Sequence, residues 1–273
     1  GANIVTSVFE DSAGRLWIGT DGGGLNLFHR ETESFTRCLH DSLNDSSISD
    51  DSVWSITQSH DGTIWTGTKK GVCALDMRTG RFTRYESAAV NDSRKDIGVV
   101  RCVYEDKTGV LWAGTNTGIY RYDPGGGFSV PFDMRLANDQ NLSETSIWSV
   151  YEDSAGRFWI GTMRAGLLLV DRSDGKFVEY LRDEKKPHSI SDNTIWRIME
   201  DSAGRLWITT SSGGLNLFHD KTGTFTSYRH DPDNPFSISS DDLFAMTEDR
   251  FHTLWITSRR TGGCSDSWKS RSA

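Results

Sequence analysis

The sequence lacks several features that would point to common classes of protein. It has no run of about 18 apolar residues, so it predicts no membrane-spanning helix. It also lacks an excess of positive charge, because 30 Lys and Arg are outnumbered by 38 Asp and Glu, and the net charge of −8 argues against a nucleic acid as partner. The four cysteines have neither a Cys-x-x-Cys pair nor metal-ligand spacing, which favours free thiols over a disulfide framework or a metal site. These cysteines are Cys38, Cys73, Cys102 and Cys264.

Catalytic motifs are missing as well. The chain contains no Gly-x-Ser-x-Gly, His-Glu-x-x-His, phosphate-loop or Gly-x-Gly-x-x-Gly motif. Among the seven histidines, His29 and His219 lie at equivalent points of the repeat described below, as do His40 and His230. Repetition explains these histidines better than a role as ligands does. We therefore expect no catalytic residue, no metal and no cofactor.

What the sequence does have is an internal repeat. It is marked by the string Leu16-Trp17-Ile18-Gly19-Thr20, which returns five times with small changes. The tryptophans of the six copies are 47 or 48 residues apart, at Trp17, Trp65, Trp112, Trp159, Trp207 and Trp255. So regular a period indicates one supersecondary unit repeated along the chain.

Each unit has the pattern of four short antiparallel strands. An alternating apolar run such as 147–152 is followed by an Asp-Ser-Ala-Gly turn and then by the Trp strand. A Gly-bearing turn leads to a third strand such as 214–218, and a second turn leads to a fourth such as 224–228. Four antiparallel strands in 40–50 residues are the blade of a β-propeller. We predict an all-β fold, a β-propeller of four-stranded blades forming a single domain over residues 1–273.

The six repeat units start near residues 4, 52, 99, 146, 194 and 242, and the last one is incomplete. After Gly263 the pattern gives way to an atypical tail at 264–273, in which no fourth strand is recognisable. We expect the native chain to continue in the repeat pattern. The sequence leaves open whether six blades close a ring.

The repeated side chains have a structural interpretation. The tryptophan found at the same place in all six units is expected to pack between neighbouring blades. The Asp-Ser-Ala-Gly segments are expected to act as hairpin turns and not as catalytic carboxylates. The Glu before the turn, for example Glu105 or Glu200, recurs too regularly for a unique catalytic acid. Asp231 and Asp233 could contact a cation, but a turn is the favoured interpretation.

The combined pattern of Val-x-x-Ile-x-Glu-Asp, Gly-x-Leu-Trp-Ile-Gly-Thr and Gly-Leu-x-x-Phe resembles the two-component regulator propeller repeat family. A Ser-Ile-Ser sequence in the linkers, at 47–49, 189–191 and 237–239, is also typical of that family. The resemblance covers about residues 3 to 263. It implies a sensor module on the periplasmic or extracellular side of a bacterial membrane, joined through a membrane helix outside this sequence to a cytoplasmic kinase or cyclase. A homodimer is one arrangement that the resemblance allows.

The order of strands predicts where a ligand binds. Because neighbouring strands alternate in direction, the linkers between blades and the loops between second and third strands share one face. These are the longest and most variable segments, where function in repeat folds tends to lie. The second residue of each first strand varies among the units, as Thr6, Trp54, Arg101, Trp148, Trp196 and Phe244. The loops between second and third strands carry cations that include Lys70, Arg164 and Arg259.

We predict that the ligand is bound by Trp54, Arg101, Trp148, Trp196, Phe244, Lys70, Arg164 and Arg259. Aromatic faces stack on sugar rings and Arg pairs with carboxylate or sulfate, so the favoured small-molecule ligand is an acidic oligosaccharide. Three alternatives remain open. The tryptophans could fill the channel as core with the loop cations solvated, the chain could be a glycan hydrolase or lyase, or the face could be a protein-interaction scaffold.

Overall fold

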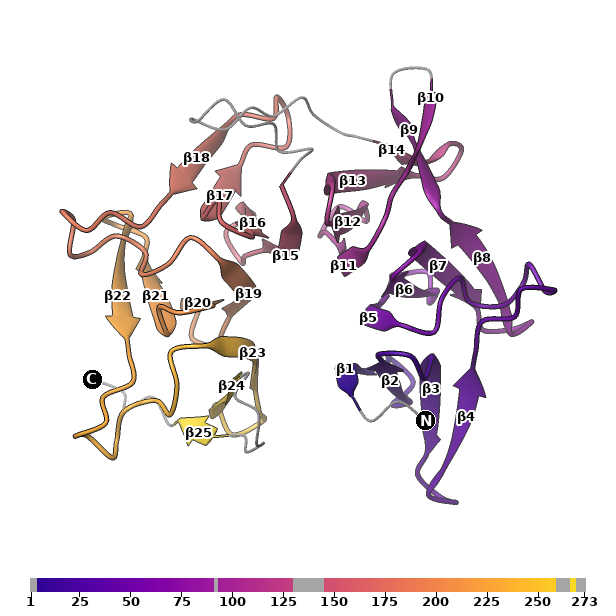
Figure 1. Ribbon diagram of the computed structural model, residues 1–273, viewed down its shortest axis with the longest axis horizontal. Helices are drawn as coiled ribbons and strands as arrows, with labels where there is room; N and C mark the ends of the chain where they lie inside the picture. Colours follow the sequence, from indigo (N-terminus) through magenta and orange to yellow (C-terminus); the bar gives the residue numbers. More distant parts are fainter. Residues whose placement is uncertain (1–3, 91–92, 130–144, 259–265, 269–273) are drawn as a thin grey trace. The chain divides into compact units, whose positions relative to one another are not determined.

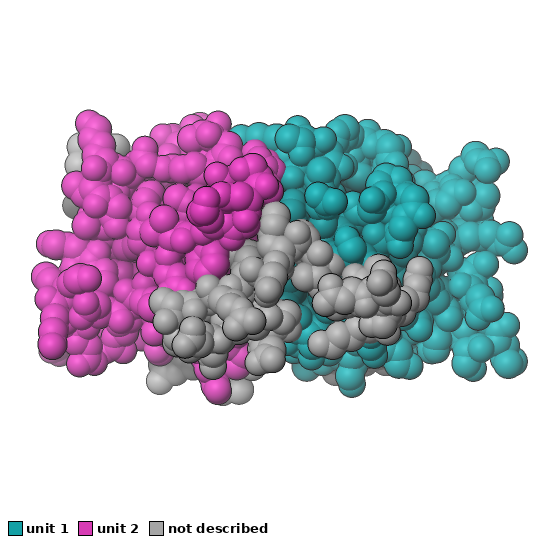
Figure 2. Space-filling model, turned by 90° about the horizontal axis from the view of Figure 1, so that it is seen from above, with its two compact units in different colours: residues 1–134, 141–147 teal, residues 135–140, 148–273 magenta. Residues whose placement is uncertain are grey.

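The computed structural model of the chain describes residues 4–90, 93–129, 145–258 and 266–268, of which 87–90, 93–95 and 266–268 are described by their backbone alone. The described residues form strands and turns and contain no helix, and therefore none long and apolar enough to cross a membrane. The strands make six sheets, one for each repeat unit (Figure 1). The chain divides into two compact units, residues 1–134 with 141–147 and residues 135–140 with 148–273 (Figure 2).

Unit 1 contains the first three sheets. The first comprises β1 (Val5–Glu10), β2 (Leu16–Thr20), β3 (Leu25–His29) and β4 (Ser34–Cys38). The second comprises β5 (Val53–Gln58), β6 (Ile64–Thr68), β7 (Gly71–Asp76) and β8 (Arg81–Tyr85). The third comprises β11 (Val100–Glu105), β12 (Leu111–Thr115), β13 (Gly118–Asp123) and β14 (Gly127–Ser129), extended by the hairpin of β9 (Ser87–Val90) and β10 (Ser93–Asp96).

Unit 2 contains the last three sheets, apart from Ile147 at the start of β15. The fourth comprises β15 (Ile147–Glu152), β16 (Phe158–Thr162), β17 (Leu167–Val170) and β18 (Phe177–Tyr180). The fifth comprises β19 (Ile195–Glu200), β20 (Leu206–Thr210), β21 (Leu215–His219) and β22 (Thr224–Tyr228). The sixth comprises β23 (Leu243–Glu248), β24 (Leu254–Ser258) and β25 (Asp266–Trp268).

The first strands of successive sheets lie side by side. In unit 1, β1 contacts β5 and β5 contacts β11, and in unit 2, β19 contacts β23. The amide of Val103 donates a hydrogen bond to Oγ of Ser55 at 3.0 Å across one such contact, and Ile198 does the same to Ser149 at 3.1 Å. Sheets stacked along their first strands are propeller blades, so the predicted all-β propeller of four-stranded blades, with an incomplete last blade, is confirmed.

The sixth blade has a third strand, β25, within the tail in which the sequence shows no recognisable repeat pattern. That the chain is one domain stays a prediction.

A glycine in the Trp strand lets neighbouring blades approach each other. A Cβ added to Gly67 would lie 2.7 Å from Cγ1 of Val100, the first residue of the next blade. Gly161 lies in the same way against Ile195, where the distance would be 2.8 Å. A larger residue at either glycine would collide with the neighbouring blade. Glycine therefore allows the close approach of the blades at these two contacts, whereas the fifth blade carries a buried Thr209 at the same position.

The repeated tryptophan fills the space between blades. Trp65 lies 5.7 Å from Tyr85 of its own blade, and 5.0 Å from Tyr122 and 6.5 Å from Phe128 of the next, measured between ring centroids. Trp159 contacts Phe218 of its next blade at 5.1 Å. Burying one such side chain contributes about 1.5–3 kcal/mol or more. The predicted packing of this tryptophan between blades is confirmed within each unit.

The Asp of the turn is tied to the same tryptophan. In the first blade the indole N–H of Trp17 donates to Oδ2 of Asp11 at 2.8 Å, while the other carboxylate oxygen accepts from the amide of Arg15 at 2.9 Å. The pairs 106–112, 153–159, 201–207 and 249–255 repeat the indole contact at 2.7–2.8 Å. In the second blade Ser59 replaces the Asp, and its hydroxyl oxygen accepts from Trp65 at 3.0 Å. The structural interpretation of these turns is confirmed.

At three of the described contacts between blades, the Glu before the turn accepts a hydrogen bond from a turn residue of the preceding blade. Glu200 accepts the amide of Ser154 at 2.6 Å, and Glu248 accepts that of Ser202 at 2.7 Å. In unit 1 the amide of His60 donates to Glu105 at 2.8 Å. Burial raises the pKa of Glu105, and the His60 amide partly offsets that effect. This contact between blades gives the recurring Glu a structural role.

Candidate ligand-binding face

In β1, β5, β11, β19 and β23 the second residue of the strand is the extra residue of a β-bulge. In the second blade Val53 pairs with Thr68 and Ser55 pairs with Gly67, so Trp54 between them has no cross-strand partner. The register shifts at the same point around Thr6, Arg101, Trp196 and Phe244. A bulge turns a side chain away from regular alternation. The same β-bulge thus presents a different side chain at the equivalent position of different blades.

In unit 1 the bulges bring a cation onto an aromatic ring. The guanidinium carbon of Arg101 lies 4.7 Å from the ring centroid of Trp54. Such a contact contributes about 0.5–2 kcal/mol, depending on how far it is shielded from water. Burial lowers the pKa of Arg101, and the charge of Asp21 opposes that effect. The buried Nε1 of Trp54 has no hydrogen-bond partner in the described part of the chain.

In unit 2 the bulge residues Trp196 and Phe244 form an aromatic triad with Trp148, the second residue of β15. The centroids of Trp148 and Trp196 are 4.4 Å apart with their planes at 72°. Phe244 lies 5.8 Å from Trp196 and 6.4 Å from Trp148. Edge-to-face pairs of this kind add about 0.5–1.5 kcal/mol each beyond the area that they bury. Trp196 is 5% exposed, so the accessible aromatic surface belongs to Trp148 and Phe244, which are partly exposed.

The loop cations stand apart from these two groups. Lys70 and Arg164 are exposed, and within the described residues neither makes an ion pair, a ring contact or a side-chain hydrogen bond with the bulge residues. Arg164 has a φ of 79°, which is uncommon for a residue other than glycine. Arg259 lies outside the described residues. Five of the eight predicted residues therefore form two contact groups, and two are solvated loop charges.

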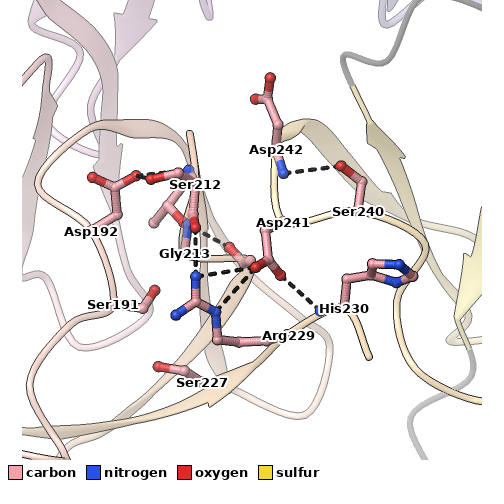
Figure 3. A network of polar contacts seen from close by, with 12 residues as sticks. Ser191, Asp192, Ser212, Gly213, Ser227, Arg229, His230, Ser240, Asp241 and Asp242 are labelled. Carbon is pink, nitrogen blue, oxygen red and sulfur yellow. Dashed lines mark hydrogen bonds and ion pairs between the residues drawn. The ribbon is translucent and has the colours of Figure 1, made fainter. Parts of the chain in front are cut away.

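The linkers are held to the loops by a polar network that the sequence analysis missed (Figure 3). Asp241 accepts the amide of His230 at 2.7 Å and pairs with the guanidinium of Arg229 at 3.1 Å. Arg229 also donates to the carbonyl oxygen of Ser212 at 2.7 Å, and the hydroxyl of Ser212 donates to Asp192 at 2.8 Å. The loop between β20 and β21 is thus fixed to the linkers on both sides of its blade.

A sequence signal for part of this network exists. An Asp or Asn stands two residues after each Ser-Ile-Ser and accepts the amide of the residue eleven positions earlier. The pairs are Asp51 with His40, Asn193 with Arg182 and Asp241 with His230, each at 2.7 Å. The recurrence is visible in the sequence, but its meaning depends on the path of the linker.

The other residues singled out in the sequence have local roles. Nδ1 of His40 lies 2.8 Å from the carbonyl oxygen of Ile48, and His230 repeats this contact with Ile238. Asp231 accepts the amide of Asp233 at 3.0 Å, which is a turn contact. In the part of the chain that the structure describes, no cluster of His, Cys, Asp or Glu could hold a metal ion. Cys38, Cys73 and Cys102 are outside any disulfide, as predicted, whereas Cys264 lies outside the described residues.

Comparison with known protein families gives one match. The model of the two component regulator propeller matches five segments of the chain, residues 1–22, 47–70, 96–117, 141–164 and 189–212. Each segment ends with the Trp strand of its blade and the start of the following loop. No curated protein matches the sequence.

Solved structures share the fold at low sequence identity. The extracellular domain of a proposed hybrid two-component system from B. thetaiotaomicron has a TM-score of 0.71 and 22% identity, covering 94% of this chain and 39% of that one. PorZ, a surface component of the type-IX secretion system of Porphyromonas gingivalis, has a TM-score of 0.69 and 15% identity over 94% of this chain and 38% of its own. Virginiamycin B lyase from Staphylococcus aureus has a TM-score of 0.64 and 15% identity over 94% and 78%. The chain thus spans about two fifths of the first two structures.

Proposed function

Because the chain belongs to the two-component regulator propeller family, we propose that it is the ligand-sensing propeller of a bacterial two-component receptor, located in the periplasm or outside the cell. Its ligand is an oligosaccharide that carries carboxylate or sulfate groups. One observation carries this proposal. Apart from Thr6 in the first blade, the residue at each described bulge is aromatic or cationic, whereas the repeated carboxylates make contacts within turns and between blades.

The chemistry of the two groups suits different parts of such a ligand. Arg101 supplies a partly desolvated guanidinium, which forms strong, directional hydrogen bonds with carboxylate or sulfate. Trp54 beneath it limits the positions that the guanidinium can take, so less rotamer entropy is lost on binding. In unit 2, Trp148 and Phe244 offer partly exposed rings on which the apolar faces of sugar rings stack.

A binding experiment tests the proposal directly. We would measure the thermal unfolding of the chain with galacturonic acid oligomers and with neutral galactose oligomers of the same length. A ligand that binds only the folded state raises Tm in a saturable way. We expect a rise with the acidic oligomer that the Arg101→Gln variant loses.

Matched controls come from the fourth strand of the first blade. Arg37 and Phe35 are exposed on β4, away from the bulges, so Arg37→Gln and Phe35→Ala should leave the shift unchanged. Equal losses in Arg101→Gln and Arg37→Gln would refute the assigned site. The absence of a shift with either oligomer would refute the oligosaccharide.

The fold shared with virginiamycin B lyase favours one other candidate, a lyase. A lyase would cleave the oligomer, whereas a sensor would only bind it. Incubation of the chain with the same acidic oligomers, followed by absorbance near the wavelength of an unsaturated uronate product, should show no product for a sensor. Steady product formation would favour the lyase.

A further inference from the structure

A groove of about 790 Å³ lies in unit 1, between β8 of the second blade and the turn that joins β13 to β14 in the third. Tyr85 and Tyr122 line it with rings whose centroids are 5.4 Å apart and whose hydroxyl oxygens are 3.1 Å apart. The turn contributes Pro124 and three consecutive glycines, so this wall carries few side-chain atoms. The groove is separate from the bulge residues of unit 1, which belong to first strands.

The equivalent place in unit 2 is filled by a cation of the chain itself. Between the fourth and fifth blades, the guanidinium carbon of Arg157 lies 5.5 Å from the ring centroid of Trp159 and 5.6 Å from that of Phe218. The same guanidinium pairs with Asp220, in the turn between β21 and β22. Burial raises the pKa of Tyr180, and the nearby charge of Arg157 opposes that effect. Three rings and a turn thus surround a guanidinium at this junction.

Unit 1 has the same arrangement of rings without the cation. The corresponding rings are paired as Trp65 with Trp159, Tyr85 with Tyr180 and Tyr122 with Phe218. Thr63 directly precedes β6, just as Arg157 directly precedes β16, so the two residues occupy the same position of the repeat. A threonine side chain has no charge and is too short to reach the rings as Arg157 does. The place of the guanidinium in unit 1 is therefore left to the groove.

The two carboxylates that hold Arg157 are also replaced in unit 1. Nε of Arg157 lies 2.6 Å from Oδ2 of Asp153, and its other partner is Asp220. The corresponding residues of unit 1 are Ser59 and Pro124, which carry no charge. The second blade has thus lost the cation together with the side chains that neutralise it.

Acidic side chains line the groove at positions that are neutral in unit 2. Glu86 corresponds to Leu181, and Asp45 corresponds to Pro187. Both carboxylates are exposed. Arg84 also lines the groove, but its guanidinium donates three hydrogen bonds of 2.6–2.8 Å to the linker before the second blade. Aromatic rings flanked by carboxylates suit an organic cation, which is attracted by the ring faces and by the negative charges.

We propose that this groove binds the guanidinium group of another molecule, at the place that Arg157 fills in unit 2. The guanidinium packs against the rings of Tyr85 and Tyr122 and pairs with the carboxylates of Glu86 and Asp45. An arginine side chain of a protein and a small molecule such as free arginine both carry this group. The proposal does not depend on the oligosaccharide.

A neutral analogue of arginine gives the sharpest test. We would measure thermal unfolding of the chain with the capped peptide acetyl-Gly-Arg-Gly-amide and with the same peptide containing citrulline, which has a similar shape but no charge. A range of about 0.1–10 mM brackets millimolar affinity. We expect a saturable rise in Tm with the arginine peptide and none with the citrulline peptide. Free arginine separates the sources, because an equal rise identifies a small molecule and a rise confined to the peptide identifies a protein side chain.

Two variants place the cation in the groove. Thr63→Arg gives the second blade a guanidinium of its own, and it should weaken binding of the arginine peptide by about tenfold, because a tethered group competes at a high effective concentration. The fold accepts arginine at this position in three other blades, at Arg15, Arg157 and Arg205. Glu86→Gln should weaken binding by roughly two- to fivefold, the range for an exposed ion pair.

Glu31→Gln is the matched control. It makes the same change as Glu86→Gln on an exposed side chain of the first blade, outside the groove, and should leave binding unchanged. An equal rise in Tm with the arginine and citrulline peptides would overturn the proposal, as would no rise with the arginine peptide. Unchanged binding in a folded Thr63→Arg variant would show that the cation does not bind at this place. Equal losses in Glu86→Gln and Glu31→Gln would refute the groove as the site.

Discussion

Units 1 and 2 use the same bulge to present opposite chemistry. In unit 1 it pairs Trp54 with the cation of Arg101, and in unit 2 it gathers three aromatic rings. The backbone is alike in both, since the register shifts at the same residue of the first strand. The comparison shows that the repeat fixes the position of the variable side chain, while the sequence of each blade sets whether that side chain is aromatic or charged.

The aromatic triad of unit 2 and the Trp54–Arg101 pair of unit 1 also differ in how deeply their side chains are buried. Trp196 is 5% exposed and contacts both other rings of its group, whereas Trp54 is partly exposed and carries a charged neighbour. The aromatic group therefore stabilises its unit, while the group in unit 1 keeps a partly desolvated charge. Removing side chains from each group should separate the two roles.

The largest expected effect is on stability. Trp196→Ala should lower the free energy of unfolding by about 3–5 kcal/mol, because it leaves a cavity among buried rings. Trp54→Ala should cost about half as much, since that ring is only partly buried. Urea denaturation followed by circular dichroism measures both values. Equal losses would show that the two groups are equally part of the core.

The next effect is on affinity. Arg101→Gln should weaken binding of the acidic oligomer by about 1.5–3 kcal/mol, the contribution of hydrogen bonds to a charged group. The same change should leave binding of the neutral oligomer unaltered. Trp148→Ala should instead weaken both, by about 0.5–1.5 kcal/mol for the lost ring. Isothermal titration calorimetry measures the affinity of each variant for both oligomers. If both variants lost the same affinity for each oligomer, the proposed difference between the units would be wrong.

Much of the fold was predictable from the sequence, because the tryptophan period and the turn residues report on local geometry. The boundaries of the first strands follow from the alternation that begins at Val53 or Ile195. The bulge was not predictable, since one extra residue in a strand leaves an apolar pattern almost unchanged. Nor was the pairing of Arg101 with Trp54, which stand 47 residues apart and meet only when blades stack. The hairpin of β9 and β10 occupies a stretch that the repeat pattern marks as linker.

A smaller effect tests whether the units agree outside their bulges. Burial raises the pKa of Asp106, but hydrogen bonds from Thr108 and Trp112 outweigh it, so the pKa lies below the usual 3.8. The pKa of Asp201 in unit 2 is lowered in the same way. A lowered pKa means that the ionised carboxylate stabilises the folded state above about pH 3.8. This stabilisation is lost as the pH falls through the folded value.

The corresponding variants are Asp106→Asn and Asp201→Asn. Each should cost about 1 kcal/mol at pH 7. The cost should shrink as the pH falls below 3.8 and through the lower pKa of the folded state, where the unmodified carboxylate also becomes neutral. Urea denaturation at the two pH values measures it. Leu206→Ala serves as the control, because Leu206 is a buried apolar side chain whose loss should not vary with pH. A difference between the two Asp variants would mean that the units differ beyond their bulges.

The smallest effects belong to the loop cations. Lys70→Ala and Arg164→Ala should change stability by less than about 0.5 kcal/mol, because both side chains are exposed. Affinity for the acidic oligomer should fall less than about threefold, and the change should vanish at 0.5 M salt, where exposed charges are screened. Titrations at low and high salt measure this. A loss that persists at high salt would place the loops inside the site.

The bulge has a consequence for how such a protein changes over time. A residue without a cross-strand partner is not constrained by pairing, so its replacement need not be matched by a second replacement on the next strand. Trp54, Arg101 and Phe244 occupy the same position, and the pairing register of the strands around them is the same. A single substitution can therefore change the side chain at this position while the pairing of the strands is kept. Within a blade, the bulge position tolerates substitution, whereas the paired positions of the strands are constrained by their partners.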